Sequence, residues 1–336
     1  MKNFLHRVLN ITCMACVATA MVSCKSSGAA KAEATGADAP ALEVPAFSTD
    51  SAMSYLKAQT DLGPRVPGTK AHKECGDYLV ERLTTWGADT VIEQNVTVKA
   101  WNGDELPLRN ILARFNSDAP GDPILLLAHW DSRPWADAET DATKAKQPID
   151  GANDGASGVA VLMEIARMAG EHGSIMPVDI LLVDGEDYGS PGNSGGDETT
   201  WCLGTQAWLE TSPYNNSRRP RYAILLDMVG GKGARFHREV VSNAYARDIV
   251  DMVWSTAASI GLGDRFVNTQ GGAVVDDHLF INRYGIPAID IIENYNESTG
   301  SFNPTWHTHD DTYENIDPST ISDTGRLISY LTIKRK

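Results

Sequence analysis

The stretch ILLLAHWDS at residues 124–132 decides the fold, because its unbroken apolar run ends on a histidine and an aspartate. Three other apolar runs also end on acidic residues: 178–183 before Asp184-Gly185-Glu186, 223–226 before Asp227, and 286–292 before Glu293. Continuous runs of this kind are typical of strands that are covered on both faces of a sheet. Parallel strands end at a common edge, so their polar ends predict a functional site there.

Helical patterns separate these runs. The expected helices cover residues 52–62, 69–86, 157–169, 243–260, 276–284 and 319–333, and two further strands are expected at 90–98 and 109–115. Alternating strands and helices predict an α/β fold of three layers, with a central mixed, mostly parallel sheet flanked by helices. Long loops at 132–152, 188–203 and 293–318 open from the same edge, and loops of that length are usually functional.

The N-terminal region predicts export rather than folded structure. A basic start is followed by an apolar run at residues 8–22 that is too short to span a membrane as an ordinary helix. A small residue before Cys24 resembles the end of a bacterial lipoprotein signal, and the alternative is an ordinary secretory signal with an incidental cysteine. We therefore expect a signal peptide at 1–23, a flexible linker rich in Ala, Ser and Gly at 24–46, and a single catalytic domain at 47–336. A lipidated Cys24 would anchor the protein in the bacterial cell envelope, facing the periplasm.

Charge and cysteine usage exclude several classes of function. The chain has 29 Lys and Arg against 44 Asp and Glu, and this net charge of −15 disfavours nucleic acid and anionic lipid headgroups as partners. The protein would then contact the membrane only through its lipid anchor. We also expect the protein to be a monomer. Cys75 and Cys202 remain after processing; they could form a disulfide, which the sequence leaves open, but no Cys-x-x-Cys pair is left for a zinc finger.

Short acidic and histidine clusters carry the chemistry. They are His129-Trp130-Asp131, Asn153-Asp154, Glu186-Asp187, Asp276-Asp277-His278 and Trp306-His307. Buried carboxylates and imidazoles need partners, and Asp154, Asp187 and His307 would supply three zinc ligands and leave one position open. Glu186 could then act as a proton shuttle beside the metal. By itself the Glu186-Asp187 pair could equally be a solvated loop.

Longer motifs resemble the zinc-aminopeptidase-like superfamily. They are HWDS at 129–132, GANDGASGVAVLMEIAR at 151–167, DGEDYG at 184–189, LLDMVG at 225–230, DDHLFINRYGIPAIDII at 276–292 and WHTHDDTYENID at 306–317. They occur in the family's order from about Ser51 onward. Within this group the chain is most similar to the glutaminyl cyclases of animal type and their bacterial lipoprotein relatives, above all at HWDSRPWAD, residues 129–137.

The resemblance implies a role for each site residue. Asp154, Asp187 and His307 match the zinc ligands, although animal cyclases have Glu at the position of Asp187. Glu186 matches the general acid and base, and Asp227 with Asp276 matches a carboxylate pair across the pocket. Trp201 and Trp306 match the aromatic walls that hold the substrate, although each could also be an ordinary core residue. His129 matches a ligand of a second zinc in dinuclear relatives, and Asp131 would orient His129 or the local loop.

The implied activity is cyclisation of an N-terminal glutamine of a peptide or protein to pyroglutamate, with release of ammonia and with one zinc ion per chain. Two alternatives remain. The first is a dinuclear zinc aminopeptidase, which would use His129 and Asp227 on a second ion; those enzymes typically carry Ser-Asp-His where this chain has Asp276-Asp277-His278. An Asp276 beside Asp227 would favour a shared proton instead of a metal, because like charges at short range do not both ionise cheaply. The second alternative is a catalytically inactive binding module of the same fold.

Overall fold

The computed structural model describes residues 43–191, 197–214 and 218–335. The chain divides into residues 1–41 and a compact unit from Leu42 to Lys336, and everything below concerns the second unit. The predicted signal peptide, Cys24 and the linker up to residue 42 lie outside the described residues. Within those ranges, no helix combines the length and apolar character needed to cross a membrane.

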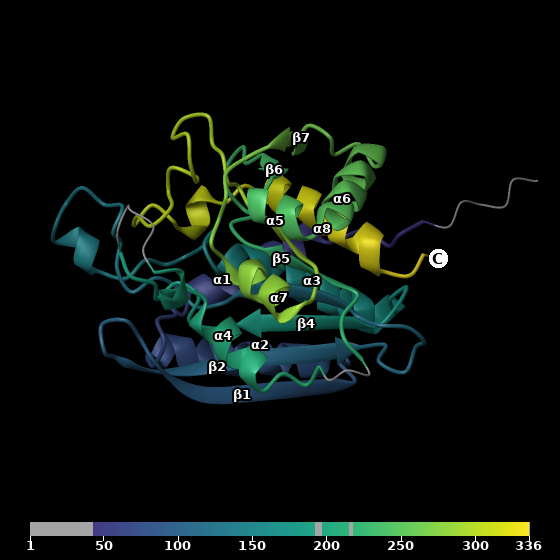
Figure 1. Cartoon of the computed structure of the whole chain (residues 1–336), viewed down its shortest axis with the longest axis horizontal. Coiled ribbons are helices and arrows are strands. Elements are labelled where there is room, and N and C mark those ends of the chain that lie inside the picture. The colour runs from purple at the N-terminus through teal and green to yellow at the C-terminus, as the bar shows by residue number, and fades with distance from the viewer. Residues whose placement is uncertain (1–42, 192–196, 215–217, 336) are drawn as a thin grey trace, which may run out of the picture. The chain divides into compact units, whose positions relative to one another are not determined.

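A six-stranded mixed sheet forms the centre of the unit, in the order β1-β2-β4-β3-β5-β8 (Figure 1). The strands are β1 Thr90–Lys99, β2 Glu105–Phe115, β3 Ile124–His129, β4 Val178–Val183, β5 Tyr222–Leu226 and β8 Ala288–Ile291. The pairs β1–β2 and β2–β4 are antiparallel, whereas β4, β3, β5 and β8 run parallel to one another. This confirms the predicted mixed, mostly parallel sheet.

Helices cover both faces of the sheet, as the unbroken apolar strands predicted (Figure 1). One layer holds α1 Thr49–Thr60, α2 Lys70–Thr85, α3 Ala156–His172 and α8 Pro318–Thr332, and the other holds α4 Leu203–Glu210, α5 Val240–Tyr245 and α7 Asp277–Tyr284. Along β3, Leu126 and Ala128 pack into the first layer's core, and Leu125 and Leu127 pack into the second. Both faces of the strand are therefore buried, which explains its continuous apolar sequence.

Two parts of the fold differ from the prediction. The helix expected at 243–260 is two helices, α5 and α6 Arg247–Ser259, because Ala246 leaves helical geometry at φ −140°. A small second sheet of β6 Phe236–Arg238 and β7 Phe266–Gln270 was not predicted, and neither was α4. These strands are short, and most of their side chains are partly or fully exposed, so they lack the periodicity that marks a strand. Short 3-10 turns lie at Lys144–Lys146, Glu198–Thr200 and Tyr313–Asn315.

Helix α3 lies unusually close to the sheet at Gly158. A methyl group at this position would lie 2.1 Å from the carbonyl oxygen of Leu226, the residue before Asp227. We expect Gly158→Ala to lower the free energy of unfolding by roughly 1–3 kcal/mol or more, because the backbone of β5 would have to move. Urea unfolding measures this effect. Gly263→Ala is the matched control: its added carbon would meet atoms no closer than 3.8 Å, so a loss as large as that of Gly158→Ala would contradict the explanation.

Candidate active site

The polar residues after four neighbouring strands meet at one edge of the sheet. The register pairs His129 at the end of β3 with Val183 at the end of β4, so Glu186 and Asp187 emerge beside His129. Asp227 follows β5, and Asp154 and Asp276 lie at the N-terminal ends of α3 and α7. His307 comes from the loop between β8 and α8. The structure thus brings together residues that are far apart in the sequence, at the edge where they were predicted.

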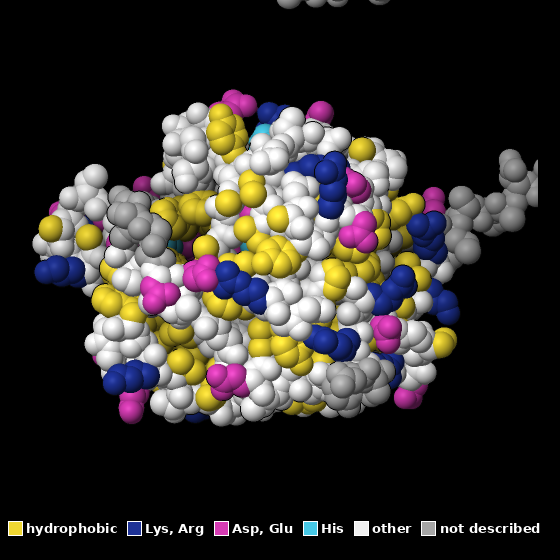
Figure 2. Space-filling model, in the orientation of Figure 1, with side chains coloured by type: hydrophobic (Ala, Val, Ile, Leu, Met, Phe, Trp, Pro, Cys, Tyr) yellow, Lys and Arg dark blue, Asp and Glu magenta, His cyan; other side chains and the backbone are white. Residues whose placement is uncertain are grey.

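A cavity of about 260 Å³ opens at this edge. It is lined by Asp154, Glu186, Asp187, Trp201, Asp227, Met228, Ala273, Val274, Val275, Asp276, Ile292, Phe302, Trp306 and His307. Figure 2 shows a hollow below the loops between β8 and α8, with apolar side chains around it. A larger open groove of about 660 Å³ lies between α2 and strands β1 and β2, but none of the predicted site residues is among its described lining.

Asp154, Asp187 and His307 form a buried group that suits a metal ion. One ligand atom from each lies within 4.8 Å of the others. Nε2 of His307 is 3.3 Å from Oδ1 of Asp187 and 3.6 Å from Oδ2 of Asp154. Oδ2 of Asp187 is buried without a hydrogen-bond partner among the described residues. Such an oxygen is costly to bury unless a cation or donor is added. One nitrogen and two carboxylate oxygens fit zinc with an open position.

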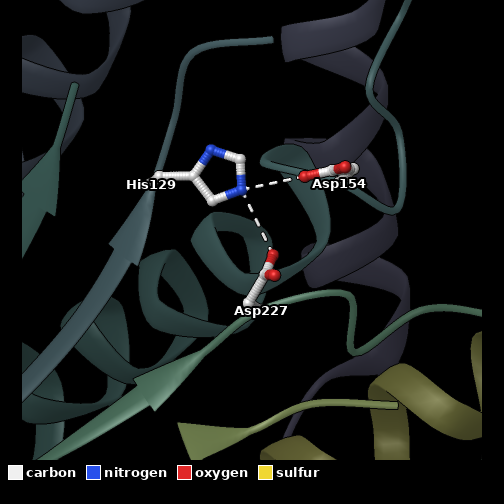
Figure 3. Close-up of side chains that lie close together, drawn as sticks. All are labelled: His129, Asp154 and Asp227. Atoms are coloured by element: carbon white, nitrogen blue, oxygen red, sulfur yellow. Dashed lines mark hydrogen bonds and ion pairs between the residues drawn. The ribbon is translucent and has the colours of Figure 1, made fainter. Parts of the chain in front are cut away.

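His129 lies between Asp154 and Asp227, which is the arrangement that a second ion would use (Figure 3). Its Nε2 is 3.1 Å from Oδ1 of Asp154 and 3.2 Å from Oδ1 of Asp227. Burial disfavours the imidazolium, but hydrogen bonds to Asp131, Asp154 and Asp227 hold the pKa of His129 well above its ordinary value. A protonated His129 can therefore pair with both carboxylates and offset one of their two negative charges without a second metal ion.

Asp131 supports the turn that carries Glu186 and Asp187. Its two carboxylate oxygens accept hydrogen bonds from the backbone N–H groups of Glu186 and Asp187, each at 3.2 Å. The same carboxylate lies 3.4 Å from Nδ1 of His129. Asp131 therefore contacts both the histidine and the loop, the two alternatives that the sequence left open.

Glu186 is a buried carboxyl at the wall of the cavity. Burial raises its pKa well above the ordinary value, and the charges of Asp276 and Asp187 add to this rise against the opposing charge of His129. A carboxyl with a raised pKa is a stronger base than an ordinary carboxylate, and a positioned carboxyl of this kind can accept a proton and return it. The thiol of Cys202 donates a hydrogen bond to Oε1 of Glu186 at 3.6 Å. Cys202 and Cys75 are both free and buried, which answers the open question about a disulfide.

Asp276 has a second carboxyl neighbour that the sequence did not reveal. Ligand atoms of Asp276, His278 and Asp290 lie within 4.8 Å of one another, and Asp290 is fully buried on β8. Burial raises the pKa of Asp276 well above its usual range, and the charges of Asp227 and Asp277 raise it further. Nothing in the sequence pointed to Asp290 as a site residue, because it is a single aspartate within the apolar run at 286–292. Whether Asp227 holds Asp276 stays a prediction, since the resolved contact of Asp227 is with His129.

Two tryptophans border the metal group. The ring of Trp306 stacks on His307 with centroids 3.7 Å apart, and the ring of Trp201 lies nearly parallel to His307 at 6.4 Å. Both line the cavity and are only partly buried. Trp201 lies directly against the backbone of Gly189, where an added methyl group would come within 2.0 Å of the indole. Both side chains are therefore available to a ligand in the cavity.

Other residues that hold the site were missed in the sequence. Asp311 accepts hydrogen bonds from the backbone N–H groups of Asn153 and Asp154, at 2.7 and 3.0 Å, and so fixes the turn before α3. Arg133 contacts Asp187, and Asp137 contacts His307. Asp311 and Arg133 fall inside quoted motifs, but a sequence does not reveal which backbone groups or distant side chains they reach.

Backbone strain is concentrated here. Among the described residues, four other than glycine have a positive φ: Asn116, Cys202, Met228 and His307. Three of them belong to the site, since Cys202 contacts Glu186, Met228 follows Asp227 and His307 is a metal-ligand candidate. Such conformations cost of order 1–3 kcal/mol each and persist where surrounding structure enforces them, which is typical of functional sites.

Known proteins share this fold and sequence. The model of peptidase family M28 matches residues 110–332. A glutaminyl cyclase from Bacteroides thetaiotaomicron, solved with N-acetylhistamine, is 43% identical, with a TM-score of 0.82 over 88% of this chain and 100% of that chain. A Zn-dependent exopeptidase from Parabacteroides distasonis is 44% identical, with a TM-score of 0.82 over 86% of this chain and 99% of that chain.

A curated relative extends the likeness to animals. The glutaminyl-peptide cyclotransferase of Bos taurus is 22% identical over 314 residues, which cover 82% of this chain and 81% of the relative. The matching model spans well over half of the chain, and the solved bacterial structures match nearly all of the described unit. The chain therefore belongs to peptidase family M28, in the group that includes the bacterial glutaminyl cyclases.

Proposed function

We propose that this protein is a zinc-dependent glutaminyl-peptide cyclotransferase, which converts the N-terminal glutamine of peptides and proteins to pyroglutamate and releases ammonia. One observation carries the proposal: Glu186 and the carboxyl of Asp276 line the same small cavity as the metal group and the two tryptophans. A proton shuttle, a second buried carboxyl and aromatic walls suit a reaction in which the substrate supplies its own nucleophile. The similarity to bacterial glutaminyl cyclases supports the same reading.

The reaction forms one bond and breaks one. The substrate's α-amine attacks the side-chain amide carbon, a C–N bond closes the five-membered lactam, and the bond to the amide nitrogen breaks. Glu186 takes the proton from the α-amine and returns it to the departing nitrogen, so that ammonia leaves. Asp276 binds that nitrogen during transfer. The attack is intramolecular, so the cavity contributes mainly by holding the reacting atoms in line.

Asp154, Asp187 and His307 would hold the zinc ion. A zinc ion bound there would supply Lewis-acid polarisation of the amide carbonyl. Trp201 and Trp306 would enclose the glutamine side chain and exclude water, which would otherwise compete with the α-amine. We propose one ion per chain, with His129 acting through its ion pairs to Asp154 and Asp227.

A peptide with an N-terminal glutamine tests this function. We expect the mass spectrum of the product to show loss of ammonia with every peptide bond intact, together with ammonia release in solution. The same peptide with its α-amine acetylated is the control and should not react, since the nucleophile is blocked. Release of a free amino acid without pyroglutamate would instead support the dinuclear aminopeptidase, which the group His129, Asp154 and Asp227 would also suit. No reaction of either kind, in protein loaded with zinc, would support the inactive binding module.

We further propose a lipid anchor at Cys24 that holds a monomer on the periplasmic side of the bacterial envelope. The support is the sequence pattern before Cys24 and the Ala-, Ser- and Gly-rich segment after it. Membrane fractionation tests the anchor, because Cys24→Ala should release the protein from the membrane fraction. Retention of that variant would contradict it.

A further inference from the structure

Arg133 is a fully buried arginine in the loop after β3, and the proposed reaction gives it no role. A buried guanidinium is costly unless several acceptors surround it. Nη1 donates hydrogen bonds to the carbonyl oxygen of Asp187 at 2.9 Å and to Oδ1 of the same residue at 3.1 Å. Asp187 is thereby held at its backbone and at one carboxylate oxygen, and Oδ2 is left for the metal.

The other edge of the same guanidinium reaches Asp137. Nε and Nη2 donate to Oδ1 and Oδ2 of Asp137, both at 2.7 Å, which is the paired geometry that arginine makes with a carboxylate. Oδ1 of Asp137 also lies 2.9 Å from Nδ1 of His307. The contact is an ion pair rather than an aligned hydrogen bond. A carboxylate beside Nδ1 leaves Nε2 as the metal-binding nitrogen. Arg133 therefore reaches His307 through Asp137.

The guanidinium lies over two aromatic rings. Its central carbon lies 4.8 Å from the ring centre of Trp201 and 5.2 Å from that of Trp135. Trp201 is a wall of the cavity, so one side chain contacts a metal-ligand candidate, the support of a second candidate and the substrate wall. A lysine could keep the charge but not this set of contacts, because its single ammonium has neither the planar fork nor a face for stacking.

We propose that Arg133, together with Asp137, is a positioning residue of the zinc centre that sets Asp187 and His307 for the metal and holds Trp201 against the cavity. The inference rests on the zinc site of the proposed function but not on which reaction the site performs. Arg133 is not itself among the residues that line the cavity. Its effect passes through Asp187 and Trp201, which it contacts, and through Asp137 to His307.

The metal affinity of Arg133→Lys tests the proposal. Apoprotein is titrated with zinc against a chelator of known affinity, and we expect binding about 10–100-fold weaker than in the wild type, the loss typical when a supporting contact of a metal ligand is removed. Arg167→Lys is the matched control. Arg167 also pairs with two carboxylates, Glu164 and Glu171, but on α3 away from the site, so its variant should bind zinc like the wild type.

A second variant keeps the test independent of folding. The side chain of Asp137 is 25% exposed, so Asp137→Asn should fold, and we expect weaker zinc binding there too. With cobalt in place of zinc, the visible absorption bands should shift in both variants, because the ligand geometry changes. In the peptide assay, Arg133→Lys should also raise KM through Trp201, whereas Asp137→Asn should mainly lower kcat.

The outcomes separate the two proposals. Wild-type zinc affinity and cobalt spectra in folded Arg133→Lys and Asp137→Asn would overturn the positioning role, even if the wild type cyclises peptides. Weakened zinc binding in both variants with an unaffected Arg167→Lys would support it, whichever reaction the wild type catalyses. A wild type that binds no zinc would overturn the proposed function, and the positioning role with it.

Discussion

Replacement of Glu186 by glutamine should lower kcat for cyclisation by about 10²–10⁴-fold, the usual contribution of a positioned acid and base. Glutamine keeps the size of the side chain but cannot take the proton from the α-amine or return it to the leaving nitrogen. KM should change little, because the substrate would still be held by the metal group and the two tryptophans. Steady-state kinetics with a glutaminyl peptide, followed by ammonia release, measure both constants.

Two controls make this result specific to the proton transfer. Zinc content must stay at the wild-type level, because Glu186 precedes the ligand candidate Asp187. Glu198→Gln removes a carboxylate three residues before Trp201 that is exposed and paired with Arg283, and it should leave kcat unchanged. Wild-type activity in zinc-loaded Glu186→Gln would contradict the role of Glu186 as acid and base.

Removal of zinc should abolish the activity, and one equivalent of zinc per chain should restore it. The loss should be near complete, because without the ion nothing polarises the amide carbonyl of the substrate. One equivalent is expected because His129 already makes ion-pair contacts with Asp154 and Asp227. Dialysis against a chelator, followed by stepwise zinc addition with activity and bound metal measured at each step, tests both statements.

The stoichiometry distinguishes the two enzyme classes. Magnesium added to the apoprotein is the control and should not restore activity, since a site with an imidazole ligand favours zinc over magnesium. Recovery only at two equivalents, together with amino-acid release, would contradict the one-zinc cyclase and favour the aminopeptidase. Undiminished cyclisation in fully metal-free protein would contradict the zinc-dependent mechanism altogether.

The central sheet could be predicted from the sequence because its strands are buried on both faces. The strand predicted at 178–183 has the same bounds as β4. The strand predicted at 124–128 is shorter than β3 by one residue, His129. The small sheet of β6 and β7 could not be predicted in this way, because its side chains are largely exposed and carry no pattern of their own. The break at Ala246 was missed for a similar reason, since neither glycine nor proline marks it.

The metal-facing residues could also be placed at one edge, since they follow strands or begin helices. Their supports could not. Asp137 lies four residues from Arg133 but 170 residues before His307, and only the folded loops bring it to that ring. Asp290 lies within an apolar strand, and its neighbour Asp276 belongs to a helix that packs against that strand.

The sequence by itself determined which residues can do the chemistry, because carboxylates and imidazoles at the ends of buried strands are costly without a shared partner. It also determined the layered fold that collects them, through the length and apolar character of the strands. The tertiary structure alone decided how each group is oriented: which oxygen of Asp187 is left unpaired, which nitrogen of His307 faces the ligand group, and that Arg133 reaches both. Orientation depends on hydrogen bonds and ring contacts between distant segments, and their geometry exists only once the chain has folded.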